Sequence, residues 1–264
     1  MKKILLVFVV LCCVILGVFF YKNSEPTPET TLPTVPLNVA PSVTNPVIEK
    51  YNSRISSFNN LQSKASFTYY DKIINITLKG WVYLEKPKNF RIIINSFFGN
   101  KAIDIGSNFE LFWFWSKWMD KLNSAYHKDY EKTRLKDPLN PMWLMESFGL
   151  SPLDSSKVEV RELDKQWAVS ESVKSQFGYM LKKTCFINKI TYRLEGYALT
   201  DENGKILATS EVKEYFGELP KKILFNWKTE NLTLMVDLTK PVVNHQINSN
   251  FWKMPDITPK EEMR

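Results

Sequence analysis

Cysteine, histidine and glycine are scarce in this sequence, and each scarcity excludes a kind of protein. Three cysteines in 264 residues are too few for a disulfide scaffold, and two histidines leave little material for a zinc site or a histidine-based triad. No two of the nine glycines lie within six residues of each other, so the sequence has neither a glycine-rich phosphate loop nor a Gly-x-Ser-x-Gly motif. We therefore expect no catalytic centre, no metal and no cofactor, and a binding protein rather than an enzyme.

The overall composition indicates a folded domain with a basic surface. Hydrophobic residues make up 44% of the chain and aromatic residues 14%, which is ample for a core. The formal net charge is +7, but the lysines are scattered among acidic residues and form no basic element of the kind that binds nucleic acid. The excess charge is either a solvated surface or an attraction to anionic lipid headgroups or an acidic partner.

Residues 1–21 are typical of a signal anchor or a signal peptide. Lys2 and Lys3 precede an apolar run over residues 4–20, which would rise about 25 Å as a helix, at the lower edge of what spans a bilayer. The positive-inside rule keeps the two lysines in the cytoplasm and sends the remainder across. We predict a domain on the periplasmic side of the inner membrane, anchored by a single pass. Lipidation through Cys12 or Cys13, or cleavage and release into the periplasm, are the alternatives.

Residues 22–45 predict a linker that is rich in proline and threonine. Five prolines recur there among Thr, Ser and Glu, with almost no aromatic residue. Such a tract cannot bury a core and samples extended polyproline II conformations. It is either a passive linker or a tether that lets the domain, residues 46–264, work at a distance from the membrane.

Periodicity predicts one helix followed by a large sheet. Asn45 and Pro46 resemble a capped helix start, and the apolar residues that follow recur at steps of three and four, which predicts a helix over residues 46–62. Beyond residue 65 the period becomes two, with turn signals between short runs. Ten or eleven strands in one curved antiparallel sheet or barrel are expected, with a bulge or bend at Gly196, where the apolar positions change from even to odd.

A second helix interrupts the strands and is apolar nearly all round. Asn140 and Pro141 supply its start and Gly149 its stop. Its side chains are either a plug in the core or a lid over an apolar ligand cavity. The candidate ligand contacts of this helix are Met142, Trp143, Leu144, Met145 and Phe148.

The densest apolar stretch, residues 109–119, carries aromatic residues on both faces of a strand. It is either a central strand buried on both sides or a strand with one face lining an acyl-chain cavity. The wall of that cavity would be Phe112 and Phe114, or Trp113 and Trp115.

Four segments of the chain resemble the family of periplasmic lipoprotein carriers and outer-membrane lipoprotein receptors (LolA/LolB-like). They are residues 80–91 (GWVYLEKPKNFR), residues 102–113 (AIDIGSNFELFW), the helix at residues 141–145 and the closing residues 250–255 (NFWKMP). The resemblance implies a mainly β fold: an incomplete, half-open antiparallel barrel of about eleven strands, closed by covering helices over a cavity for lipoprotein acyl chains. It implies no catalysis. Trp81, which lies in the first of these segments, is a further cavity candidate.

The same resemblance implies a role for Arg91 in holding the lid closed, since a guanidinium can bond several carbonyls at once. Arg91 is opposite in phase to Phe90 and Ile92, so it is alternatively an outward-facing strand residue. We therefore expect a non-enzymatic protein of the cell envelope that binds and transports lipoproteins or other lipids. The alternative is an envelope scaffolding or interaction module with a filled barrel interior.

Overall fold

The computed structural model describes residue 32 and residues 45–70, 75–118, 121–133, 140–175, 178–256 and 260–262. No helix among these residues is long and apolar enough to cross a membrane. The apolar run at residues 4–20, Cys12, Cys13 and nearly all of the linker lie outside the described residues.

The described chain consists of strands with few helices. The elements are α2 (Asn45–Ser56), β1 (Asn60–Tyr70), β2 (Asn75–Glu85), β3 (Asn89–Asn95), β4 (Lys101–Ser107), β5 (Leu111–Ser116), β6 (Lys121–Tyr126), the 3-10 helix η2 (His127–Lys132), α3 (Pro141–Glu146), β7 (Val158–Glu162), β8 (Gln166–Lys174), β9 (Met180–Asn188), β10 (Leu194–Asp201), β11 (Ile206–Phe216), β12 (Leu219–Trp227), β13 (Leu232–Val243), the 3-10 helix η4 (Ser249–Trp252) and β14 (Lys260–Glu262).

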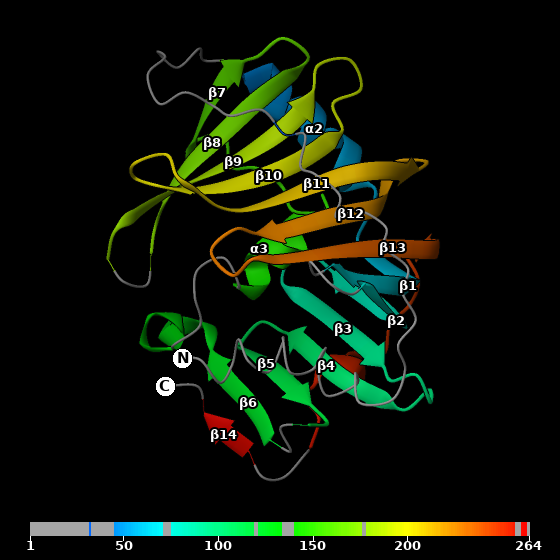
Figure 1. The fold of residues 1–264 in the computed structure, drawn as a ribbon. Coiled ribbons are helices and arrows are strands. Elements are labelled where there is room, and N and C mark those ends of the chain that lie inside the picture. The colour runs from blue at the N-terminus through cyan, green and yellow to red at the C-terminus, as the bar shows by residue number, and fades with distance from the viewer. Residues whose placement is uncertain are drawn as a thin grey trace.

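All the described strands belong to one open, curved sheet (Figure 1). Its order is β14-β6-β5-β4-β3-β2-β1-β13-β12-β11-β10-β9-β8-β7, so β13 returns to pair with β1 in the middle. Strands β1 to β13 are antiparallel, and the short β14 adds to the edge in parallel with β6. The prediction of a mainly β, unclosed sheet is confirmed, but the predicted strand number was too low: the described residues form fourteen strands instead of about eleven.

The two α-helices of the described residues, α2 and α3, cover the same face of this sheet. In β9 and β10, Leu181 and Leu199 lie in the apolar cluster that contains α3, whereas Cys185 and Tyr197 lie in the cluster that contains α2. Because residues an even number apart along a strand point to the same face, the two clusters share it. We call this the inner face. The opposite, outer face carries a small cluster of Ala168, Phe186 and Ala198, on which Leu32 of the linker packs.

The expected irregularity at Gly196 is present. The pairing of β10 with β9 shifts register between Leu194 and Gly196. A Cβ atom at position 196 would lie 2.2 Å from the carbonyl oxygen of Ser210, so the close approach of β11 requires glycine here.

The first helix is shorter than its apolar periodicity predicts. It ends at Ser56, and β1 begins at Asn60, so Leu61 pairs with Leu84 and Val243 instead of continuing the helical stripe. The side chain of Asn60 donates to the carbonyl of His245 at 2.9 Å and accepts from its N–H at 3.0 Å. These bonds to a distant segment favour the strand over another turn of helix.

Candidate functional site

Helix α3 lies on the inner face near the centre of the sheet, beside β12 (Figure 1). Its ends follow the sequence signals: the Asn140 side chain accepts from the N–H of Met142 at 2.9 Å, and Gly149 follows the helix at a φ of 69°. The cap fixes where the helix begins, because it satisfies a free N–H. Gly149 fixes where it ends, because only glycine adopts this φ without strain.

The candidate side chains of α3 pack against aromatic residues of β12. The Trp143 ring lies edge-on to Phe225 and Trp227, with centroids at 6.0 and 6.2 Å, and Phe148 lies 6.2 Å from Phe225. Trp143, Met145 and Phe148 are buried, whereas Met142 and Leu144 are half-buried. The described side chains thus fill the space between α3 and β12, as a plug would or as a lid would in its closed position.

An ion-pair cluster attaches α3 to the sheet. Lys183 of β9 lies 3.0 Å from Glu146 and 3.2 Å from Glu171 of β8. Burial raises the pKa of Glu146 in spite of the opposing Lys183 charge. Burial acts to lower the pKa of Lys183, but the two carboxylates outweigh it and raise that pKa. The cluster is therefore the polar contact that would have to break for α3 to leave the inner face.

Hydrogen bonds also connect α2 to the segment that follows α3. The Asn52 side chain donates to the carbonyl of Leu153 at 2.8 Å and accepts from its N–H at 2.9 Å. The Tyr51 hydroxyl donates to the carbonyl of Ser151 at 3.3 Å. The two inner-face helices are thus connected through residues 151–153.

The aromatic candidates on the strands divide between the two faces. Phe114 packs against the inner-face cluster, and Phe112 shares its side of β5. Trp113 and Trp115 point the other way, and Trp81 does the same, with its ring stacked at 5.8 Å from Tyr83. Trp81, Trp113 and Trp115 therefore lie on the outer face, away from any cavity beneath α3, because side chains alternate along a strand.

Arg91 lies on the outer face in a buried polar cluster. Its Nε and Nη2 donate to Asp104 at 3.0 and 2.7 Å, and its Nη1 donates to the carbonyl of Phe251 at 2.6 Å. Lys101 and the Trp113 indole N–H also donate to Asp104, at 2.9 and 3.1 Å. The guanidinium thus binds the C-terminal segment rather than α3, and its role in lid control stays a prediction.

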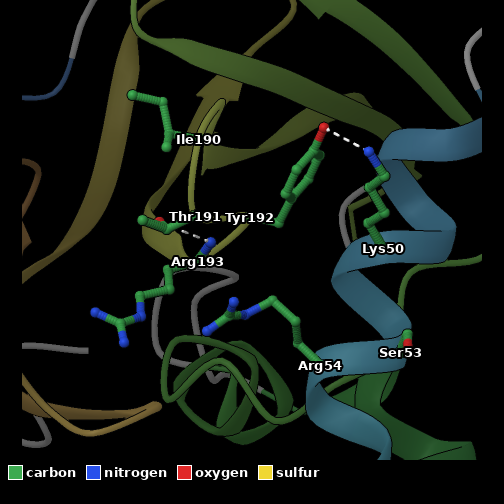
Figure 2. Close-up of a pocket in the computed structure, with 7 residues that line it drawn as sticks. All are labelled: Lys50, Ser53, Arg54, Ile190, Thr191, Tyr192 and Arg193. Atoms are coloured by element: carbon green, nitrogen blue, oxygen red, sulfur yellow. Dashed lines mark hydrogen bonds between the residues drawn. The ribbon is translucent and has the colours of Figure 1, made fainter.

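A pocket that the sequence interpretation did not foresee lies between α2 and the β9–β10 turn (Figure 2). Its volume is about 380 Å³. We call it the α2 pocket, and its lining residues are Lys50, Ser53, Arg54, Ile190, Thr191, Tyr192 and Arg193. Nothing in the sequence places the β9–β10 turn beside the basic residues of α2, which lie about 140 residues earlier in the chain.

The chain resembles known proteins in its structure, but its sequence does not match theirs. No family model matches the sequence, and no curated protein sequence matches it significantly. A LolA superfamily protein from Nitrosomonas europaea superposes with a TM-score of 0.53 at 9% identity, covering 79% of this chain and 96% of that one.

Two further solved structures superpose equally well. A domain named for outer membrane lipoprotein sorting, from Vibrio parahaemolyticus, gives a TM-score of 0.53 at 10% identity, covering 78% of this chain and 94% of that one. A DUF1329 family protein from Desulfovibrio piger gives 0.52 at 11% identity, with coverages of 80% and 98%. The resemblance seen in the sequence is thus confirmed for the fold: this chain has an open antiparallel sheet with inner-face helices, similar to that of the LolA superfamily.

Proposed function

We propose that this protein binds the acyl chains of a lipoprotein or another lipid on the inner face of its sheet and carries them without catalysis. In this proposal α3 covers the inner face and moves aside when a chain enters. The protein works on the periplasmic side of the inner membrane, held there by residues 4–20, or alternatively by a lipid on Cys12 or Cys13, or released after cleavage. The fold shared with a LolA superfamily protein supports this class of function.

One observation carries the proposal: the Trp143 indole N–H is buried without an acceptor among the described residues. A buried donor without a partner costs about 1–3 kcal/mol. The rest of the indole packs edge-on against the rings of Phe225 and Trp227. An ester or amide carbonyl of an acylated ligand would supply the missing acceptor, so the ligand-bound state would satisfy a group that the closed state does not.

The half-buried side of α3 offers the test. Leu144→Asp places a carboxylate where an acyl chain would have to pass, whereas Leu163→Asp makes the same chemical change beside the outer-face cluster. The full chain should bind an environment-sensitive fluorescent fatty acid, and native mass spectrometry should show a co-purifying species of acyl-lipid mass. We expect Leu144→Asp to abolish binding and Leu163→Asp to preserve it. Equal binding by both variants, each with an intact circular dichroism spectrum, would exclude α3 as the cover.

The packed inner face supports a second candidate, an envelope scaffolding or interaction module. Trp143, Met145 and Phe148 are buried against the protein's own β12 side chains. If that packing is permanent, the purified chain will carry no lipid and will refuse the fluorescent probe. The same two measurements therefore separate the module from the carrier.

A further inference from the structure

Three cationic side chains line the α2 pocket from two separate elements. Arg54 points toward Arg193, and the Lys50 amine extends to the Tyr192 hydroxyl (Figure 2). Lys50 and Arg54 come from consecutive turns of α2, and Arg193 comes from the β9–β10 turn (Figure 2). A volume of about 380 Å³ lies within the range of small-ligand sites. The pocket is therefore large enough for a phosphate ester and is lined by the side chains that bind phosphate best.

The charges at this pocket do not balance. Glu218 accepts from Arg193 Nη2 at 2.9 Å through one carboxylate oxygen and pairs with Arg54 through the other. The lining of the pocket itself holds three cations and no carboxylate. Burial, together with the neighbouring Arg193 charge, lowers the pKa of Arg54. A bound anion would relieve this repulsion and would be shared by both guanidinium groups.

The turn that carries Arg193 is held in a fixed conformation. The Asn188 side chain accepts from the N–H groups of Ile190 and Thr191 at 3.0 and 2.9 Å. Tyr192 adopts a φ of 53°, which is uncommon for a large side chain. This conformation brings the Tyr192 hydroxyl within 3.1 Å of Lys50 Nζ, which donates to it. The turn residues that line the α2 pocket are thus preorganised, which reduces the conformational entropy lost when a ligand binds.

A second, narrow space lies between the α2 pocket and the end of α3, and we call it the passage. Arg54, Tyr192 and Arg193 line both the pocket and this passage, so the two spaces are adjacent. The passage also touches Gly149, at the end of α3, and has a volume of about 20 Å³, room for little more than a water molecule. Its other lining residues are the apolar Ile55, Phe58, Leu194 and Pro220, together with Tyr51, Tyr215 and Glu218.

We propose that Lys50, Arg54 and Arg193 bind the phosphate of an anionic amphiphile whose acyl chain enters along this passage to the inner face at the end of α3. This inference rests on the proposed acyl-chain function and adds to it a headgroup chemistry and an entry point. The passage widens as α3 moves, and the phosphate replaces Glu218 as the partner of the two arginines.

The test compares three probes by isothermal titration calorimetry on the full chain in nanodiscs of a zwitterionic lipid, with empty nanodiscs subtracted. Dihexanoyl phosphatidylglycerol carries both phosphate and chains, dihexanoyl glycerol carries the chains alone, and glycerol 1-phosphate carries the phosphate alone. The variants are Arg54→Gln with Arg193→Gln, and Glu218→Gln, which frees both arginines. Lys117→Gln with Lys228→Gln is the matched control, since it removes the same charge from turns at the opposite end of the sheet.

We expect phosphatidylglycerol to bind at least tenfold more weakly to the double arginine variant, more tightly to Glu218→Gln and unchanged to the lysine control. Dihexanoyl glycerol should bind all four proteins alike. If phosphatidylglycerol also binds all four alike, the headgroup site is excluded while the acyl-chain function stands. If only glycerol 1-phosphate binds, and does so through the arginines, the pocket takes a free phosphate and the amphiphile is excluded. If no probe binds, both proposals fail.

Discussion

Arg91 and Asp104 form a bidentate ion pair on the outer face of the sheet, with Nε–Oδ1 and Nη2–Oδ2 distances of 3.0 and 2.7 Å. Asp104 is fully buried. The third guanidinium nitrogen donates to the carbonyl of Phe251, so one side chain joins β3, β4 and the C-terminal segment. The pair thus keeps residues 249–252 against the outer face of β3 and β4.

Replacing Asp104 by asparagine should destabilise the fold by about 3–5 kcal/mol, because it leaves the buried Arg91 charge without its carboxylate. Urea denaturation followed by tryptophan fluorescence would measure the loss. Asp154→Asn is the matched control, since Asp154 pairs with Lys157 at the exposed surface. That variant should be indistinguishable from the parent, and a comparable loss in both would contradict the central role of the buried pair.

The stability should also fall in acid through the same residue. Burial alone would raise the pKa of Asp104, but hydrogen bonds and charges from Arg91 and Lys101 outweigh it and lower that pKa below its usual 3.8. A lowered carboxyl pKa stabilises the folded state above pH 3.8, and the contribution is lost as the pH falls through the folded-state pKa. Denaturation at several pH values should therefore show the gap between the parent and Asp104→Asn closing below about pH 4. A gap that is constant down to pH 2.5 would contradict this assignment.

Phe251→Ala should release the C-terminal segment while leaving the sheet folded. The Phe251 ring lies 4.4 Å from Tyr83 and 4.9 Å from the Arg91 guanidinium, and each such contact contributes about 0.5–2 kcal/mol. Hydrogen exchange of residues 245–256 should become faster, whereas β12 keeps its protection. Equal acceleration in both regions would instead indicate global destabilisation.

Cys185 should be unreactive toward thiol reagents in the folded protein. It is buried among the α2 contacts, and burial raises the pKa of its thiol to about 12. Labelling of Cys185 with a maleimide at pH 7.5, followed by peptide mapping, should therefore be slow until urea unfolds the domain, because the thiolate is the reactive species. Fast labelling of Cys185 in buffer would contradict this prediction and would show that α2 leaves the inner face readily.

Local patterns were sufficient for much of the fold. Alternating polarity predicted the strands, the Asn140 cap and Gly149 predicted both ends of α3, and the phase change at Gly196 predicted the bulge. Each of these signals lies within a few residues of the structure it specifies, so propensity, capping and side-chain direction are readable along the chain.

The remaining features depend on which distant segments pair. The helix at α2 ends before Leu61 because β13 and β2 pair with that residue, and Arg91 faces Asp104 because of the register between β3 and β4. The α2 pocket requires Arg54 and Arg193 to meet across about 140 residues. Sequence periodicity indicates which residues are buried but carries no information about their long-range partners. Only the tertiary structure therefore decides these contacts.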